Sequence, residues 1–140
     1  MAKSCSLPKG AFPVKFKVKS VVHALELAKG LIRPFKHWTV GLLAATGVKD
    51  EFAGYGENEK SPRAEAFCAL GALRRVNTKY GRKAEKFLQE AAGIILGNDT
   101  APNPGDIFRV NDGVRDKKTH RTVLKMFTKA IRLAKKAEAK

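Results

Sequence analysis

The chain has 140 residues, of which 28 are Lys or Arg and 13 are Asp or Glu, so its formal net charge at pH 7 is +15. This length suits a single domain, and no segment reaches the roughly 20 apolar residues that a membrane span requires. The first residues lack the apolar stretch of a secretory signal, and two cysteines allow at most one disulfide. We therefore expect a protein of the reducing cytoplasm with no membrane partner.

The positive charge is concentrated at the two ends of the chain. Residues 1–37 carry eight basic residues against one acidic residue, a net charge of +7. Residues 38–112 carry ten of each sign and are neutral, whereas residues 113–140 carry ten basic residues against two acidic ones, a net charge of +8. A neutral body with two basic ends favours a polyanionic partner, usually nucleic acid, less often an anionic membrane surface or an acidic protein.

The first 19 residues predict a basic extended arm, because Pro8, Gly10 and Pro13 disfavour regular structure there. From residue 14 onward, apolar and basic side chains alternate, which places one set on each side of an extended chain. This alternation is typical of a short strand, and an extended arm lying on the domain gives the same pattern. The basic set consists of Lys15, Lys17 and Lys19.

The next 40 or so residues predict one helix followed by irregular chain. Ser20 is a good N-cap, and apolar residues at helical spacing continue from Val21 to about Ile32, after which Pro34 ends the helix. The chain that follows is the least regular part of the sequence. Within it, Trp38–Ala44 is compatible with a short strand.

The stretch Ala66–Leu73 is the centre of the predicted fold. It carries no charge and no strongly polar group, and a helix that is apolar all round is a buried helix. Ser61-Pro62 is a helix-start signal, so we expect this helix to run from there to about Asn77. Gly71 is unfavourable in a helix relative to Ala, which predicts the close approach of another backbone at this position.

A third helix is predicted from about Arg82 to Leu96, with Ile95 on its inner face and Gly97 as its stop signal. Residues 98–118 contain several prolines and glycines and predict a long loop. Within this loop, Ile107–Val110 is predicted to be a short extended piece.

Thr119 is predicted to cap a last helix that continues to about Ala137, with an apolar inner side and a strongly basic outer side. The whole pattern predicts a mainly α fold. It is a compact domain of four helices around a buried central helix, with a short β element and a long loop before the last helix. Residues 1–19 are then an arm, residues 20–134 one helical domain, and residues 135–140 a basic tail that continues the last helix.

Four short motifs stand out along the chain. They are Trp38-Thr39, the run Phe-Cys-Ala-Leu-Gly-Ala-Leu-Arg-Arg at residues 67–75, Asn111-Asp112, and Thr119-His120. Together they resemble an uncharacterised family of small bacterial and bacteriophage proteins, a domain of unknown function, over about residues 20–134. The resemblance implies the domain boundary, the importance of these positions, and a setting in a bacterial cytoplasm or a virion. It implies no activity.

Cys68 and His120 are compatible with a thiol–imidazole pair, in which Asn111 or Asp112 would orient the imidazole. A cysteine nucleophile needs a nearby base or another influence that lowers its pKa. A buried cysteine commonly behaves as a small apolar side chain, and the apolar surroundings of Cys68 in the sequence favour that interpretation. Asn111 and Asp112 likewise suit hydrogen bonds from side chain to backbone. We therefore predict no catalytic residue, with Cys68, His120 and Asp112 as the alternative.

Arg74 and Arg75 end the central helix, where cations complement the helix dipole, and they are also candidates for binding an anion. The three histidines are dispersed without the spacing of metal ligands, and no phosphate-binding glycine loop occurs, so neither a metal nor a cofactor is predicted. Trp38 and Phe108 are expected in the core or at its rim rather than as platforms for bases.

The sequence favours a small, basic, non-enzymatic binding protein that contacts the phosphates of nucleic acid with low sequence specificity. The same expectation includes association with a nucleic-acid-containing assembly, as for an accessory or structural protein of a bacteriophage, and a protein partner is an additional possibility. The alternative is a small enzyme, or a domain that binds anionic ligands, built on Cys68, His120 and Asn111 or Asp112. The expected phosphate contacts lie on the arm and the last helix: Lys15, Lys17, Lys19, Arg121, Lys125, Lys129, Arg132 and Lys136.

Overall fold

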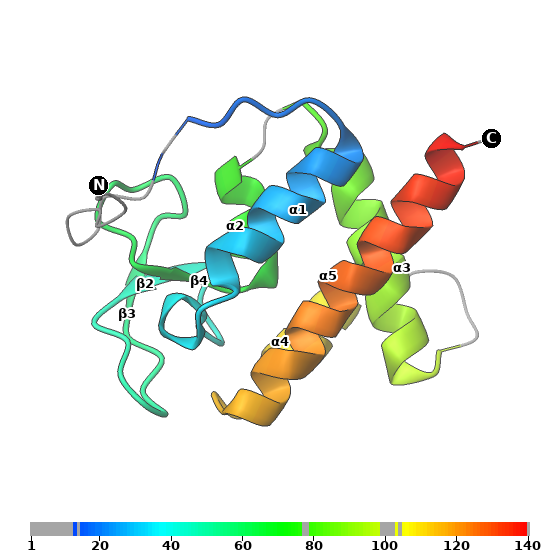
Figure 1. Ribbon diagram of the computed structural model, residues 1–140. Helices are drawn as coiled ribbons and strands as arrows, with labels where there is room; N and C mark the ends of the chain where they lie inside the picture. Colours follow the sequence, from blue (N-terminus) through cyan, green and yellow to red (C-terminus); the bar gives the residue numbers. More distant parts are fainter. Residues whose placement is uncertain (1–12, 14, 77–78, 99–102, 104, 140) are drawn as a thin grey trace.

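The computed structural model describes residues 13, 15–76, 79–98, 103 and 105–139. Within these residues the chain forms five α-helices, one short 3-10 helix and one sheet of three strands (Figure 1), so the predicted mainly α fold is confirmed. The elements are α1 (Val21–Ile32), η1 (Phe35–His37), β2 (Ala44–Thr46), β3 (Tyr55–Glu57), β4 (Ala66–Phe67), α2 (Ala69–Val76), α3 (Gly81–Leu96), α4 (Asp106–Asn111) and α5 (Lys117–Glu138).

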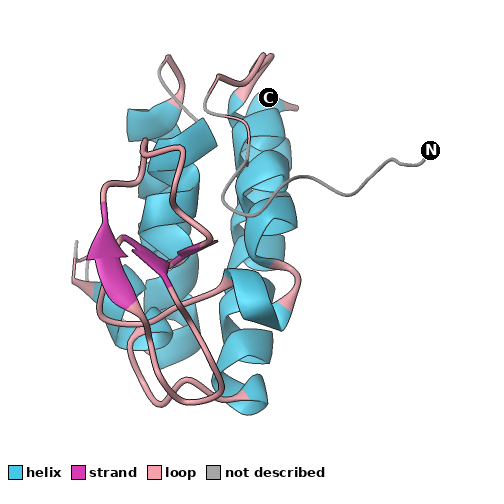
Figure 2. Cartoon of the chain, turned by 90° about the vertical axis from the view of Figure 1, so that its left-hand side faces the viewer, coloured by secondary structure: helices cyan, strands magenta, loops and turns pink. Residues whose placement is uncertain are grey.

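The helices form one body, and the small sheet lies at one side of it (Figures 1 and 2). Helix α5 packs on α1, α3 and α4, and α2 packs on α1, α3 and α4. The strands are antiparallel in the order β3-β2-β4, with Ala45 of the central strand paired with Gly56 and Ala66. The largest fully buried apolar side chains form the core: Trp38, Phe67, Phe127, Leu25, Ile32, Leu73, Leu88, Ile107, Met126 and Val123.

The boundaries of α1 and α3 agree with the sequence because local signals define them. The Ser20 hydroxyl accepts a hydrogen bond from the His23 amide at 3.0 Å, as an N-cap does. Gly97 follows the last residue of α3 in the left-handed region, with a φ of 75°. Helix α3 begins at Gly81, one residue before the predicted start.

The central helix is shorter than predicted. Helix α2 begins only at Ala69, and the two residues before Cys68 form strand β4, which pairs with β2. Ser61-Pro62 lies in a turn well ahead of the helix. A short apolar run looks the same in a buried strand as in a buried helix, so its pattern cannot separate the two. The buried position of the segment is confirmed, since every residue of α2 except Arg74 is buried.

Gly71 marks the close approach of two backbone segments. A Cβ atom placed on this residue would lie 1.7 Å from the carbonyl oxygen of Leu43, which precedes β2. The expected backbone contact is therefore confirmed. The same oxygen accepts a hydrogen bond from the Cys68 amide at 3.2 Å, so it holds the turn from β4 into α2.

Two predictions for the chain after α3 are wrong in detail. Ile107–Val110 lies inside α4 and is not extended; a helix this short depends on its contacts with α3 and α5. The last helix begins at Lys117, because the Asp116 carboxylate rather than Thr119 is its N-cap and accepts a hydrogen bond from the Thr119 amide at 2.8 Å.

The structure of the segments before β4 also differs in part from the prediction. The short strand expected over Trp38–Ala44 is displaced to Ala44–Thr46, where two partner strands flank it. The described part of the arm forms no strand, but Phe16 and Val18 pack against the core while the three lysines that alternate with them are exposed. The alternation therefore reflects an extended chain lying on the domain. Residues 1–12 and 14 of the arm lie outside the described residues.

Replacing Gly71 with Ala tests the backbone contact, and Gly30→Ala in α1 is a matched control. The methyl group at position 71 has no room beside the Leu43 carbonyl oxygen, so we expect the free energy of unfolding to fall by about 3 kcal/mol or more. An added Cβ at Gly30 has no atom within 4 Å, so Gly30→Ala should gain about 0.5–1 kcal/mol from helix propensity. Urea unfolding followed by circular dichroism measures both changes, and an unchanged midpoint for Gly71→Ala would contradict the contact.

Candidate functional site

Asn111 is the centre of a buried polar network that joins distant segments of the chain. Its Oδ1 accepts hydrogen bonds from the Trp38 indole nitrogen at 2.8 Å and from the Ala69 amide at 3.0 Å. Its Nδ2 donates to the Thr39 carbonyl oxygen at 3.1 Å and to Asp112 Oδ1 at 2.7 Å. This buried amide thus uses its full capacity of two accepted and two donated bonds. Three of the four sequence motifs meet here.

Asp112 carries the network to the surface. Its side chain is exposed, and its Oδ1 accepts a second hydrogen bond from the Gly41 amide at 3.0 Å. The predicted bonding from side chain to backbone is present, but its partners lie in the segment after η1 and at the start of α2. The Asn-Asp motif therefore links segments that are far apart in the sequence.

Arg115 fixes the loop before α5. Its guanidinium donates to the backbone carbonyl oxygens of Trp38 at 2.8 Å and Phe35 at 2.7 Å, and also to that of Asp50. It lies 4.2 Å from the centroid of the Phe35 ring. Burial lowers the pKa of Arg115, yet a guanidinium keeps its charge in proteins. This arginine, which the sequence did not single out, is therefore an interior structural cation.

His120 completes the network on the inner face of α5. Its Nε2 lies 2.7 Å from the Ile32 carbonyl oxygen, and because a carbonyl only accepts, Nε2 carries the proton. The ring packs on Trp38 and Phe35, with centroid distances of 5.2 and 5.6 Å. Burial lowers the pKa of His120, the bond to Ile32 raises it, and the charge of Arg115 lowers it further. The net pKa lies below the ordinary value, so the ring is mainly neutral at pH 7.

Cys68 has the environment of a packing residue. Its side chain is buried, and its Sγ accepts a hydrogen bond from the Gly71 amide at 3.3 Å. Burial raises the pKa of the thiol to about 11, whereas a nucleophilic cysteine needs a lowered pKa. Within the described part of the chain, no hydrogen bond joins Cys68 to His120 or Asp112. The geometry thus lends no support to the predicted alternative of a thiol–imidazole pair.

The two arginines at the end of α2 have different surroundings. Arg74 is exposed and lies 3.4 Å from the Glu85 carboxylate of α3. Arg75 is completely buried, so the two side chains do not form one anion-binding surface. The Arg75 guanidinium donates at 2.6–2.9 Å to three backbone carbonyl oxygens, those of Pro13, Glu59 and Ser61.

A row of basic side chains, which we call the α5 stripe, runs along the solvent side of the last helix. At about 100° per residue, its members lie within an arc of about 80°, opposite the buried side of the helix, and extend over about 27 Å. None of them forms an ion pair with the part of the chain that the structure describes. The members are Lys118, Arg121, Lys125, Lys129, Arg132 and Lys136.

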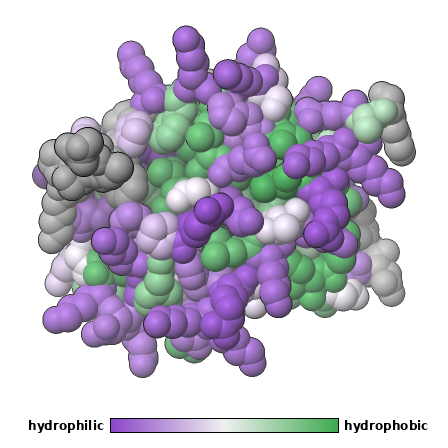
Figure 3. All heavy atoms as spheres, in the orientation of Figure 1, coloured by the Kyte–Doolittle hydropathy of each residue, from purple (hydrophilic) through white to green (hydrophobic). Residues whose placement is uncertain are grey.

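The residues just before α1 and the C-terminal end of the α5 stripe lie at the same end of the body (Figure 1). Helices α1 and α5 are in contact and run in opposite directions (Figure 1). A hydrogen bond of 2.8 Å from Lys29 Nζ to the Thr128 hydroxyl links them. The arm leads into the N-terminus of α1, near the C-terminal end of α5. Hydrophilic side chains project from this edge and across the face that Figure 3 shows.

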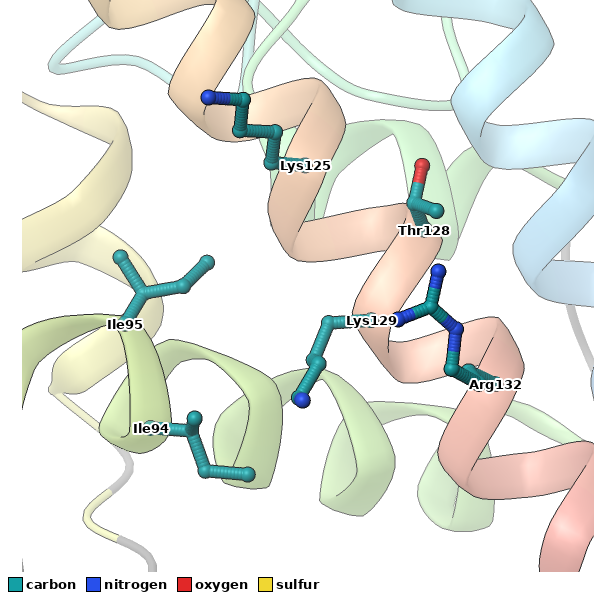
Figure 4. Close-up of a pocket in the computed structure, with 6 residues that line it drawn as sticks. All are labelled: Ile94, Ile95, Lys125, Thr128, Lys129 and Arg132. Carbon is teal, nitrogen blue, oxygen red and sulfur yellow. The ribbon is translucent and has the colours of Figure 1, made fainter.

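A groove of about 330 Å³ lies between α5 and the C-terminal end of α3 (Figure 4). The α3 side consists of Ile94 and Ile95, whose exposed fractions of 48% and 37% are high for large aliphatic side chains. Ile95 was predicted on the inner face, but the last three residues of α3 extend past the core and are exposed. The α5 side consists of Lys125, Thr128, Lys129 and Arg132.

Two features of this surface were not predicted, although the sequence contains patterns that indicate them. Lys118 has the helical spacing of the stripe, but it falls before the predicted start of the last helix. The run Ile94-Ile95-Leu96 places three large aliphatic residues in succession, and one helix cannot bury three successive side chains against the same core. Such a run predicts exposed apolar surface.

Within the described part of the chain, no three His, Cys, Asp or Glu side chains come together as a metal site would need. None of the described helices has the length and apolar character to cross a bilayer. The features that remain for a binding role are therefore the α5 stripe, the arm lysines and the groove.

Replacing Asn111 with Ala should lower the free energy of unfolding by about 2–4 kcal/mol, because it leaves the buried Trp38 indole and Ala69 amide without their acceptor. Asn58→Ala is the control. Asn58 is exposed and accepts one hydrogen bond, from the Lys60 amide at 2.7 Å, so its loss should cost less than about 1 kcal/mol. Urea unfolding compares the two variants. Equal losses of free energy of unfolding would show that the network stabilises the fold no more than a surface hydrogen bond does.

Stability should fall as the pH is lowered from about 7.5 to about 5. The pKa of His120 in the folded protein lies below its ordinary value of 6.5, so the unfolded chain binds more protons in this range and the free energy of unfolding rises with pH. His37 acts in the same direction, since burial and then the charge of Lys36 lower its pKa.

An NMR titration of the imidazole rings measures the His120 pKa directly. His37→Gln is the control and should leave the lowered midpoint of His120 in place. A midpoint at or above about 6.5 for His120 would contradict the buried, neutral assignment.

Comparison with known proteins gives one result. A family model, described as a family of unknown function (DUF6197), matches residues 17–133. No curated protein and no solved structure is similar enough to match the chain. The matched range contains the whole Asn111 network and most of the α5 stripe, and it covers far more than half of the sequence. The chain therefore belongs to the family of unknown function DUF6197.

Proposed function

We propose that the protein binds the phosphate backbone of nucleic acid with little sequence preference, using the α5 stripe as its main contact. The observation that supports this most is the arrangement of six cations on one solvent-facing arc of a 22-residue helix. A helix holds such charges at fixed spacing, so their potentials add along one line. The absence of ion pairs with described residues leaves these charges available to a ligand.

The arm adds a second cationic element to the same proposal. Phe16 and Val18 anchor it on the core, while Lys15, Lys17 and Lys19 remain exposed. Because residues 15–19 are held on the core in this way, they need little further ordering on binding, and their lysines contribute at low entropic cost. The setting that we propose is a bacterial cytoplasm or, for a structural protein of a bacteriophage, a virion.

The neutral body supports a scaffold role in this proposal. Its buried polar groups are engaged with one another and with backbone, and the Cys68 thiol is protonated at neutral pH. Sequence is read by contacts to base edges, whereas phosphate contacts only position a protein. A row of lysines and arginines on a helix makes phosphate contacts, so we expect binding without base readout.

The affinity for a labelled DNA duplex should fall steeply with salt. If all six stripe cations contact phosphates, log K plotted against log salt should have a slope of about −5. The triple variant Lys125→Gln/Lys129→Gln/Arg132→Gln removes three of these contacts, so its slope should be about −3 and its affinity at low salt at least roughly tenfold lower. Fluorescence anisotropy over a salt series measures both quantities.

The matched control is Lys49→Gln/Arg63→Gln/Lys79→Gln. It removes the same charge, from the same two residue types, at exposed positions of the neutral body. Its slope and affinity should stay close to those of the unmodified protein, because these residues are not part of the stripe and salt screens exposed charges that make no contact with the ligand. Equal losses in the two triple variants, or an affinity independent of salt, would overturn the proposed function.

A further inference from the structure

The groove between α3 and α5 has two unlike walls. Lys129 extends from α5 toward Ile94, and Lys125 lines the groove from an earlier turn of α5 (Figure 4). No acidic side chain is among the described residues that line it, so the α5 wall is wholly cationic or neutral. A ligand that fits both walls is anionic on one side and apolar on the other, and it is small enough for both sides to lie in this one groove.

We infer that this groove binds one nucleotide unit of a single-stranded nucleic acid. A phosphate contacts the cations of α5, and the face of the unpaired base packs on Ile94 and Ile95. The inference rests on the proposed function, and it makes single strands the preferred substrate class of the same surface.

The apolar wall is what distinguishes single strands from duplexes. The outside of a duplex presents phosphates, sugars and base edges, whereas its base faces are stacked inside, so two exposed isoleucines meet no base face there. An unpaired base presents an apolar face next to its own phosphate, and packing of that face adds affinity without sequence preference. The α5 stripe alone would serve both substrates, whereas the groove favours the single strand.

The size of the groove agrees with a small ligand unit such as one nucleotide. Its volume of about 330 Å³ is at the lower end of the roughly 300–1,000 Å³ of small-molecule sites. The remaining stripe cations continue beyond it in both directions along α5, with Arg121 on one side and Lys136 on the other. A chain of phosphates that leaves the groove therefore meets further cations at either end.

The test compares one labelled oligonucleotide of about 12 nucleotides, a length within known single-strand site sizes, as a single strand and as a duplex. The double variant Ile94→Ser/Ile95→Ser should weaken single-strand binding by roughly five- to tenfold, and duplex binding by less than about twofold. Leu96→Ser is the matched control, since Leu96 is 40% exposed on the same helical turn but does not line the groove. It should change neither affinity, and circular dichroism verifies the fold of each variant.

The outcomes separate the two levels of the proposal. Preferential loss of single-strand binding in the double variant supports the inference. Equal affinity of the unmodified protein for both substrates, or an equal effect of the double variant on both, overturns the inference and leaves the proposed function standing. Failure to bind either substrate at low salt overturns both.

Discussion

The carboxamide of Asn111 is the group on which the interior depends. It holds the Trp38 segment and the start of α2 to the end of α4, three parts of the chain that have no local reason to meet. Arg115, in the loop before α5, binds the same Trp38 segment. His120, in α5 itself, binds the end of α1. A buried polar network of this kind is favourable only when all its members are satisfied, so these segments must assemble together.

Helix α5 has the protein interior on one side and the proposed binding surface on the other. Its inner side carries His120 and the apolar side chains that meet α1, α3 and α4, and its outer side carries the cations. The residues that suggested chemistry in the sequence, Cys68 and His120, belong to the interior. The four sequence motifs thus specify how the domain is built, whereas the least distinctive residues, surface lysines and arginines, carry the proposed function.

Local signals explain why part of the fold could be predicted from the sequence. A capping serine and a stop glycine define α1 and α3, and an unfavourable glycine in an apolar run revealed the contact of α2 with the Leu43 carbonyl. Strand β4 and helix α4 depend on partners distant in sequence, so no local pattern separates them from the alternatives. The same holds for Arg115, which is buried only because three backbone carbonyls converge on it. Five of the six stripe residues followed from helical spacing, but the groove needs α3, and its position relative to α5 is set by tertiary packing.

Trp38 gives the protein an internal optical reporter. It is the single tryptophan of the chain, it is completely buried, and its indole nitrogen is bonded to Asn111. The His120 ring against which it packs lies on the inner side of α5, away from the stripe and the groove. Tryptophan emission therefore follows the integrity of the interior and is insensitive to occupancy of the outer surface. In a variant of the outer surface, a loss of binding with unchanged emission is a change in the surface, and a shift in emission is a change in the interior.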